Sequence, residues 1–398
     1  MSQIMIDDKE NILNTYKRFN VVLTEGKGSI LVDEKGKKYI DFSSGIGTNI
    51  YGICDDAWIN AVCEQANKIQ HTSNLYYSEP QVKLAKLLCE NTGMKKVFFS
   101  NSGAESNECA IKTARKYSFD KYGEGRNEII TLVNSFHGRT IATLSATGQD
   151  VFHQFFFPFV DGFKHAPAND IEALDKLITD KTCAIMIETV QGEGGVNALD
   201  PEFIKHIDKV CKEKDLVFIV DEVQTGNGRC GYLYSYMEYG VHPDVVTTAK
   251  GIAGGLPFGA ILFSEKTEKT LGYGQHATTF GGNPICAAAA YSVIKRIDDK
   301  LLNHVREMRK FLEEKLNGKS GIKSISGKGL MVGIELEDGY KAPDIVAKGI
   351  ENGVIMLTAK SKIRLLPPLN ITKEDLNKGL DLLLKSMEDL KKWSIYWH

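Results

Sequence analysis

A lysine stands where an extended run of β-branched residues ends and a glycine-rich segment begins. In the segment DVVTTAKGIAGG, Lys250 follows Val245–Thr248 and precedes three glycines. The lysine is therefore either a solvated cation at the end of a strand or an amine held in a deep site lined by backbone. In a site of the second kind, a lysine amine can form an imine with a carbonyl compound.

Carboxylates follow two other apolar runs. Asp221 follows Leu216–Val220 in the segment VDEVQTG, and Glu188 follows Ala184–Ile187 in IETVQGEGG. A carboxylate at the tip of a buried strand is desolvated, so it needs a cation or an N–H group as its partner. Asp221 alone fits a helix cap or a structural ion pair as well as a ligand site.

Two further strand ends suit an anion and a flat ring. In SNSGAESN, a turn of small residues opens a helix, where the free N–H groups of Gly103 and Ala104 suit a phosphate. An ordinary helix cap has the same sequence pattern. In NSFHGR, Phe136 can stack on a ring and Arg139 can bind a carboxylate through two hydrogen bonds. A core phenylalanine beside a surface arginine is the commoner outcome.

One ligand would use all of these groups. A phosphorylated aromatic aldehyde needs an anion cradle, a stacking ring such as Phe136, an acid for a ring nitrogen and a lysine for the carbonyl. Asp221 is that acid and Lys250 that lysine, while Gln224 can bind a ring hydroxyl. The loop TTFGGNP adds Thr278–Thr279 as a phosphate contact or a helix-initiation turn. This set of groups predicts pyridoxal phosphate as the cofactor.

Alternating strand and helix patterns position these residues. Short apolar runs are expected as strands at Val97–Ser100, Glu128–Val133, Ala184–Glu188, Val217–Asp221 and Val245–Thr248, and helical patterns lie between them at Glu105–Tyr117, Ile171–Leu177 and Pro201–Lys214. This alternation predicts an α/β fold, in which a mostly parallel sheet has helices on both faces. Ligands of such sheets bind outside the carboxyl ends of the strands, where the residues above lie.

The rest of the chain predicts a smaller α+β domain. An Ala- and Lys/Glu-rich helical pattern without internal Gly or Pro covers Pro284–Leu316. Short strands are expected at Leu330–Leu336, Val354–Leu357 and Lys362–Leu365, with helices at 341–352 and 372–392 and an N-terminal hairpin of Ser29–Asp33 and Lys38–Asp41. We therefore expect a large domain over residues 50–285 and a small domain of residues 1–49 together with 286–398.

Composition and charge limit which binding partners and which cellular compartment we expect. The formal net charge is -2, from 49 basic and 51 acidic residues, which gives no reason to expect nucleic acid or a membrane surface as partner. The eight cysteines form no CxxC pair, and the His and Cys residues show no metal-ligand spacing, so no metal is expected. Without a signal pattern at its start, the chain is expected in the cytoplasm.

Seven motifs along the chain resemble one family. They are NSGAESNECAIK, SFHGRT, ETVQGEGGV, DEVQTGNGR, TTAKGIAGGLPFGA, TTFGGNPICA and RLLPPL. In their order they are similar to the class III, fold-type I pyridoxal-phosphate aminotransferases, and most similar to the members that act on acetylornithine. The resemblance extends from about Val21 to Thr372. It implies a mostly parallel seven-stranded sheet with helices on both faces and a smaller α+β domain.

The resemblance also assigns roles in cofactor binding. It implies that Lys250 holds the cofactor and carries the transferred proton, and that Asp221 binds the ring nitrogen. It further implies that Phe136 stacks on the ring, that Gln224 contacts the ring hydroxyl, and that Gly103 and Ala104 bind the phosphate. Thr279 would contact the phosphate in the other subunit, which implies a homodimer with shared active sites.

Substrate residues follow from the same resemblance. Arg139 and the neighbouring Thr278 match positions that contact the substrate, and Arg364 matches the arginine that binds the α-carboxylate of glutamate. Glu193 matches an acid that can pair with this arginine, and Tyr16 matches a substrate-contacting tyrosine of ornithine aminotransferases. The implied reaction converts N2-acetylornithine and 2-oxoglutarate into N-acetylglutamate 5-semialdehyde and glutamate, a step of arginine biosynthesis.

Other functions stay open at this point. Ornithine, succinylornithine, succinyldiaminopimelate and 4-aminobutyrate are alternative amino donors. A decarboxylase or aminomutase of the same fold is disfavoured by the paired Arg139 and Arg364, and a non-catalytic amino-acid-binding protein has no use for Lys250. The sequence departs from the family at Gly52–Ala57, GICDDA, where a Gly-His-x-His-Pro pattern is common.

Overall fold

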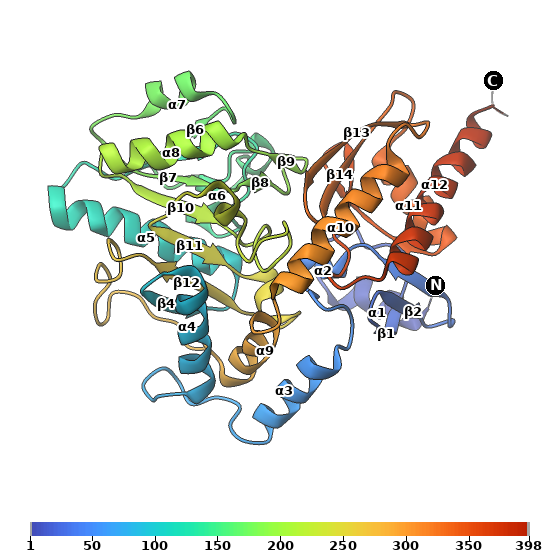
Figure 1. Cartoon of the computed structure of the whole chain (residues 1–398), viewed down its shortest axis with the longest axis horizontal. Helices are drawn as coiled ribbons and strands as arrows, with labels where there is room; N and C mark the ends of the chain where they lie inside the picture. Colours follow the sequence, from blue (N-terminus) through green and yellow to red (C-terminus); the bar gives the residue numbers. More distant parts are fainter. Residues whose placement is uncertain (1, 396–398) are drawn as a thin grey trace.

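A seven-stranded sheet forms the core of one half of the molecule in the computed structural model, which describes residues 2–395 (Figure 1). The strand order is β4-β12-β11-β10-β7-β5-β6. The strands are β4 (Lys96–Ser100), β5 (Glu128–Leu132), β6 (Phe163–Ala166), β7 (Thr182–Ile187), β10 (Val217–Asp221), β11 (Val245–Thr248) and β12 (Gly259–Phe263). Only β12 runs antiparallel to its neighbours in this sheet. The predicted mostly parallel seven-stranded sheet is confirmed.

Both faces of this sheet are buried, which explains why its central strands are apolar without alternation. Every residue of β7 and β10 is buried. Side chains on one face, such as Ile187 and Val220, pack in a cluster with Phe203 of α8, whereas Met186 and Ile219 on the other face pack with α5. The flanking helices are α4 (Glu79–Thr92), α5 (Gly103–Tyr122), α6 (Ile141–Ala146), α7 (Ile171–Leu177) and α8 (Pro201–Glu213). Helices on both faces are therefore confirmed.

A second hydrophobic core joins the two ends of the chain. Ile40 and Phe42 from the N-terminal part pack with Leu312, Ile345 and Leu380 from the C-terminal part. Two four-stranded sheets flank this core, with the orders β1-β2-β3-β15 and β13-β14-β17-β16. The blue and red ends of the chain lie together in Figure 1. On this packing we propose a large domain of residues 50–285 and a small domain of residues 1–49 together with 286–398.

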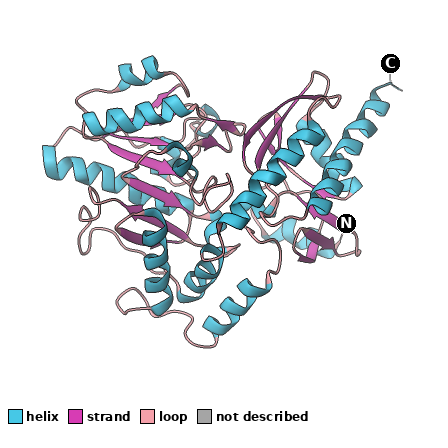
Figure 2. Cartoon of the chain, viewed as in Figure 1, coloured by secondary structure: helices cyan, strands magenta, loops and turns pink. Residues whose placement is uncertain are grey.

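The remaining elements complete the fold. The strands of the second half are β1 (Leu23–Lys27), β2 (Ile30–Asp33), β3 (Lys38–Asp41), β13 (Ile322–Lys328), β14 (Met331–Leu336), β15 (Val354–Ile355), β16 (Leu357–Ala359) and β17 (Lys362–Leu365). The helices are α1 (Gln3–Asn11), α2 (Ser44–Gly47), α3 (Asp56–Ala66), α9 (Pro284–Ile294), α10 (Asp299–Leu316), α11 (Ala342–Asn352) and α12 (Lys373–Ile395), and a small hairpin joins β8 (Val190–Gln191) to β9 (Asn197–Ala198). In Figure 2 the helices are cyan and the strands magenta, and helices lie beside the strands in both halves.

The helical pattern over Pro284–Leu316 divides into two helices, a break that the sequence pattern does not predict. Helix α9 ends at Ile294, and α10 begins at Asp299, with the Asp298 side chain accepting a hydrogen bond from the N–H of Leu301. A capping aspartate thus starts a new helix where no glycine or proline marks the break. This break lies between the two hydrophobic cores, because α9 packs on α3 and α4 and α10 packs on α12.

No helix in the described part of the chain is long and apolar enough to cross a membrane. The cytoplasmic location stays a prediction. No group of three or more His, Cys, Asp or Glu side chains that could hold a metal ion occurs among residues 2–395.

Candidate active site

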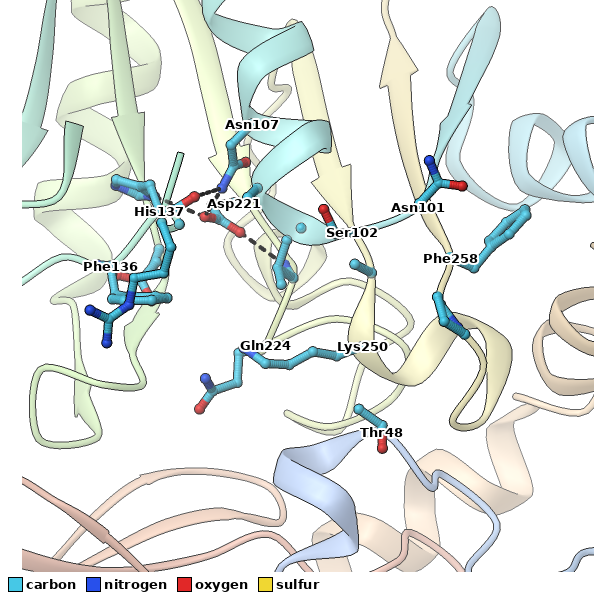
Figure 3. Close-up of a pocket in the computed structure, with 18 of the residues that line it drawn as sticks. Thr48, Asn101, Ser102, Asn107, Phe136, His137, Asp221, Gln224, Lys250 and Phe258 are labelled. Carbon is cyan, nitrogen blue, oxygen red and sulfur yellow. Dashed lines mark hydrogen bonds and ion pairs between the residues drawn. The ribbon is translucent and has the colours of Figure 1, made fainter. Parts of the chain in front are cut away.

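A cavity of about 420 Å³ opens at the carboxyl ends of the large sheet (Figure 3). Residues after five strands line it, namely β4, β5, β7, β10 and β11, and Thr48 adds a wall from the N-terminal part. The lining includes Gly103, Ala104, Phe136, Arg139, Asp221, Gln224 and Lys250. Seven residues that the sequence placed at one ligand therefore surround one cavity.

Lys250 enters this cavity from the end of β11. Its backbone has φ +40°, a left-handed conformation that L-residues rarely adopt, and it begins a short 3-10 turn, Lys250–Ala253. In Figure 3 its side chain extends across the cavity toward Gln224. Burial lowers the pKa of the Lys250 amine, and Glu193 partly opposes that shift. The fold thus shifts this amine toward its neutral, nucleophilic form relative to a solvated lysine.

Asp221, the last residue of β10, is held by an ordered set of donors. Its Oδ2 accepts hydrogen bonds from Nδ2 of Asn107 and Nδ1 of His137, both at 2.8 Å. Its Oδ1 accepts one from the backbone N–H of Val223 at 3.0 Å. The Thr247 hydroxyl donates to Oδ1 of Asn107 at 2.7 Å and so fixes which amide atom faces the carboxylate. These bonds orient an aspartate that is only 3% exposed.

The N-terminus of α5 forms an anion cradle. The Ser102 hydroxyl accepts from the N–H of Glu105 at 3.2 Å, and the N–H groups of Gly103 and Ala104 have no intrahelical acceptor, as at every helix start. A Cβ at Gly103 would lie 2.7 Å from Cγ1 of Val223, so only glycine fits there. Backbone N–H groups at the positive end of a 20-residue helix suit a phosphate.

Aromatic and charged side chains form the wall after β5. The N–H of Phe136 donates to Oε2 of Glu188 at 3.0 Å, which fixes the backbone that carries the ring. Burial raises the pKa of Glu188, the Asp221 charge raises it further, and the nearby His137 opposes the rise. Arg139 lies exposed at the rim, with its Cζ 4.1 Å from the ring centre of Phe152. Its guanidinium edge therefore stays available to a carboxylate.

A second arginine lies beside Gln224. Arg364 of β17 is 4% exposed and donates from Nη1 to Oε1 of Glu193 and, at 3.2 Å, to Oε1 of Gln224. Burial alone would raise the pKa of Glu193, but the charge and hydrogen bonding of Arg364 outweigh it and hold that pKa below its ordinary value. The pair of Glu193 and Arg364 is thus formed in this structure.

Five predicted site residues do not line this cavity: Glu193 and Arg364, which lie beside Gln224, and Thr278, Thr279 and Tyr16. Thr278 and Thr279 line a separate cavity of about 490 Å³, joined to the first by a 3.1 Å hydrogen bond from Asn101 Nδ2 to the Thr278 hydroxyl. Thr279 is exposed. Tyr16 is 74% exposed and contacts Arg18, and it does not line the cavity, so its substrate role stays a prediction without support from this geometry.

Comparison with known proteins identifies the family of this chain. The model of the class-III aminotransferases matches residues 12–387. The chain belongs to this family. An acetylornithine aminotransferase of Haemophilus ducreyi is 48% identical over 98% of this chain and 99% of its own length. A succinylornithine transaminase of Citrobacter koseri is 41% identical, with 96% of each chain covered.

A solved structure supports the fold and the cofactor of this class-III aminotransferase. The ornithine aminotransferase of Toxoplasma gondii, whose structure shows partial occupancy of pyridoxal phosphate at its active site, is 31% identical. The TM-score is 0.92, and 98% of this chain and 94% of the other are covered. The present aminotransferase is accordingly a fold-type I enzyme that depends on pyridoxal phosphate.

The residues present fit that cofactor. Within the described chain, the Lys250 amine has no hydrogen-bond partner, so it is free to react. Among residues 2–395, Oδ1 of Asp221 accepts a hydrogen bond only from the Val223 N–H, which leaves it able to accept another from a protonated ring nitrogen. The helix start at Gly103 provides the N–H groups for a phosphate on the same cavity wall.

Two residues of the site were not singled out from the sequence, and a third, Glu188, was named without a role. Asn107 and His137 hold Asp221, and Glu188 holds the backbone of Phe136. Each is buried and polar, and Glu188 was noted only as an acid at a strand end. Asn107 lies one helical turn beyond Gly103, a spacing that places it on the face toward the strand ends and could have identified it.

The Gly52–Ala57 segment, at which a departure from the family pattern is expected, is held by an aspartate. Asp55 caps helix α3 by accepting from the N–H of Trp58 at 2.9 Å. The same carboxylate binds Arg296 through two hydrogen bonds of 2.7 and 3.1 Å, and the guanidinium stacks 3.9 Å from the ring centre of Tyr51. An aspartate thus anchors the segment to the end of helix α9.

Proposed function

We propose that this aminotransferase moves an amino group between N2-acetylornithine and 2-oxoglutarate. One observation carries the proposal: a lysine amine and an oriented aspartate share a cavity that Arg139 lines, and a second arginine, Arg364, is hydrogen-bonded to Gln224 in the wall of that cavity. Two arginines suit a substrate with two carboxylates, such as glutamate or 2-oxoglutarate. A decarboxylase has no need of both arginines, and a simple binding protein has no use for the lysine.

Pyridoxal phosphate, when bound, supplies a carbonyl carbon for the amine and a cationic ring that draws electrons from the substrate carbon. Asp221 would keep the ring nitrogen protonated, because its carboxylate is fixed by Asn107 and His137. Phe136 would stack on the ring and Gln224 would bind the ring hydroxyl. Lys250 Nζ would hold the cofactor and then move the proton released from the substrate carbon, for which its lowered pKa suits it.

The pairing of Arg364 with Glu193 supports acetylornithine as the amino donor. The substrate of this half-reaction has one carboxylate, which Arg139 and Thr278 would bind, and its amine lies at the far end of a flexible chain. A free Arg364 would leave a buried cation beside the methylene groups, whereas the pair with Glu193 neutralises it. Glutamate would displace Glu193 and bind Arg364 through its α-carboxylate.

The similarity to an acetylornithine aminotransferase favours the same donor, and succinylornithine is the second candidate.

We also propose a homodimer with shared active sites. Thr279 lies outside the Lys250 cavity and is exposed, as a residue that serves a second subunit would be. Around it lie exposed aromatic side chains, including Tyr77 and Phe280, on loops joined by hydrogen bonds from Asn74 to the carbonyls of Thr278 and Gly281. Large apolar side chains exposed together favour burial against a partner. Molar mass in solution tests the assembly.

The donor is tested by initial rates. Purified protein should use acetylornithine with 2-oxoglutarate at a kcat/KM above those for ornithine, succinylornithine, succinyldiaminopimelate and 4-aminobutyrate. The Lys250→Ala variant should lose transamination while it keeps the fold, as judged by circular dichroism. Turnover in that variant would remove the proposed mechanism, and a higher kcat/KM for another donor would remove the proposed substrate.

A further inference from the structure

Arg229 is a buried cation that the proposed reaction does not use. It follows β10 by eight residues, in the DEVQTGNGR segment, and it is 1% exposed. Its Nη1 donates to the carbonyl oxygens of Leu330, at 3.1 Å, and of Pro367. Its Nε and Nη2 have no hydrogen-bond partner within the described chain.

The two carbonyls lie at one end of the strand pair that carries Arg364. In this pair Val332 of β14 is opposite Leu365 of β17, and Gly333 is opposite Arg364. The same register continued by two residues places Leu330 opposite Pro367. Proline has no N–H group, so the ladder cannot continue at that point. The Arg229 guanidinium takes the place of the missing donor and binds the carbonyls of both strands.

Further backbone bonds fix the same junction. The N–H of Leu330 donates to the carbonyl of Arg229 at 3.0 Å, and the N–H of Leu366 donates to the carbonyl of Phe42 at 2.7 Å. A Cβ at Gly329 would lie 2.5 Å from the carbonyl oxygen of Arg229, so the two segments pack closely. The large domain, the N-terminal segment and the end of β17 therefore meet at Arg229.

The charge at this junction is costly to bury. Burial lowers the pKa of Arg229 to about 10, and the buried Asp41 partly restores it. Replacing a buried ion pair by apolar residues of similar volume is often neutral or stabilising, so a buried charge is weak evidence of a role in stability. A guanidinium with two unpaired nitrogens is thus poorly explained by packing alone, and its two carbonyl contacts indicate a geometric role.

We propose that Arg229 is a positioning residue for substrates with two carboxylates, because it fixes the β17 end that carries Arg364 to the loop that carries Gln224. Arg229 is five residues beyond Gln224, and Pro367 is three residues beyond Arg364, so the contact spans the two sides of the carboxylate site. The inference rests on the proposed function of Arg364. It predicts that Arg229 acts on glutamate and 2-oxoglutarate and leaves acetylornithine nearly unaffected.

The test uses the holoenzyme and glutarate, a dicarboxylate that is not turned over. Arg229→Lys should raise the Kd of glutarate, measured by titration calorimetry, about tenfold. The reason is that Arg364 would no longer be held in the position from which it binds a carboxylate. The same variant should raise the KM of glutamate by a similar factor and change the KM of acetylornithine less than twofold. Equal effects on both substrates, or an unchanged Kd for glutarate in the folded variant, would overturn the inference.

A matched control and a double variant sharpen this test. Arg126 also donates to two backbone carbonyls, those of Lys214 and Asp215, but outside the site, so Arg126→Lys should leave glutarate binding unchanged. In an Arg364→Ala background, Arg229→Lys should have no further effect on glutarate binding. An additive loss would show that Arg229 acts independently of Arg364 and would overturn the inference.

A measurement on the wild type covers the case in which Arg229→Lys does not fold. Glutarate binding should slow hydrogen exchange at the amides of Leu330 and Leu366, which close the junction. Unchanged exchange there would contradict the coupling. Failure of the proposed function would look different, because the wild-type enzyme would then fail to turn over glutamate.

Discussion

Removal of the Arg364 side chain should separate the two half-reactions. Arg364→Ala leaves Arg139 in place, so acetylornithine keeps the arginine that binds its single carboxylate. Glutamate, in contrast, loses one of the two arginines that bind its two carboxylates. Nη1 of Arg364 already donates to Glu193 and Gln224, which shows that two acceptors can share this guanidinium. A charge-assisted hydrogen-bonded pair in a site that is 4% exposed contributes about 2–3 kcal/mol, or roughly 30- to 150-fold in KM.

Steady-state kinetics in each direction measure this effect. The KM of glutamate should rise by that factor, and the KM of acetylornithine should change less than about threefold. Arg309→Ala is a matched control, because Arg309 forms a similar 2.6 Å pair with Glu313 on helix α10, far from the site. An equal rise for both substrates in Arg364→Ala would refute the assignment of this arginine to glutamate.

Three further outcomes are expected. Asn107→Leu should weaken pyridoxal-phosphate binding by about 2- to 12-fold in fluorescence titration, because Asp221 loses one of its donors; an unchanged affinity would contradict the orienting role. Burial raises the pKa of Glu222 to about 7, so the folded state binds the extra proton, and the free energy of unfolding should fall by about 3 kcal/mol between pH 4.5 and pH 7. Urea titrations should show that Glu222→Gln flattens that fall; a slope like that of the wild type would exclude this group. Asp55→Ala removes a helix cap and the pair with Arg296, and thermal unfolding should show a loss of about 2 kcal/mol with kcat retained. A stability equal to that of the wild type would show that the segment has other support.

The strand ends were predictable because parallel strands bring their carboxyl ends to one edge of the sheet. The β-branched run Val245–Thr248 and the apolar run Val217–Asp221 are the structural strands with the same bounds. Lys250 and Asp221 therefore meet at the cavity even though they lie far apart in the sequence. The local pattern and the topology rule suffice for that much.

Other features depend on packing that a local pattern does not contain. The sequence of strand β13, Ile322–Lys328, contains serines, lysines and a glycine and shows little apolar pattern. Its pairing with β14 therefore has to be seen in the structure. Asn107 belongs to a helix face of ordinary composition, and its role follows from the contact that joins helix α5 to Asp221 at the end of β10. Arg229 looks like a surface residue in its glycine-rich segment until the register of β14 and β17 places two carbonyls beside it.

Mass mapping after borohydride reduction tests most directly whether Lys250 holds the cofactor. Reduction attaches pyridoxal phosphate irreversibly to the amine that holds it, and tryptic digestion then locates the modified lysine. We expect the phosphopyridoxyl group on Lys250 alone. The enzyme should at the same time lose its activity and the yellow colour that the bound cofactor gives it. A phosphopyridoxyl group on a different lysine would contradict the assignment of Lys250 and, with it, the proposed mechanism.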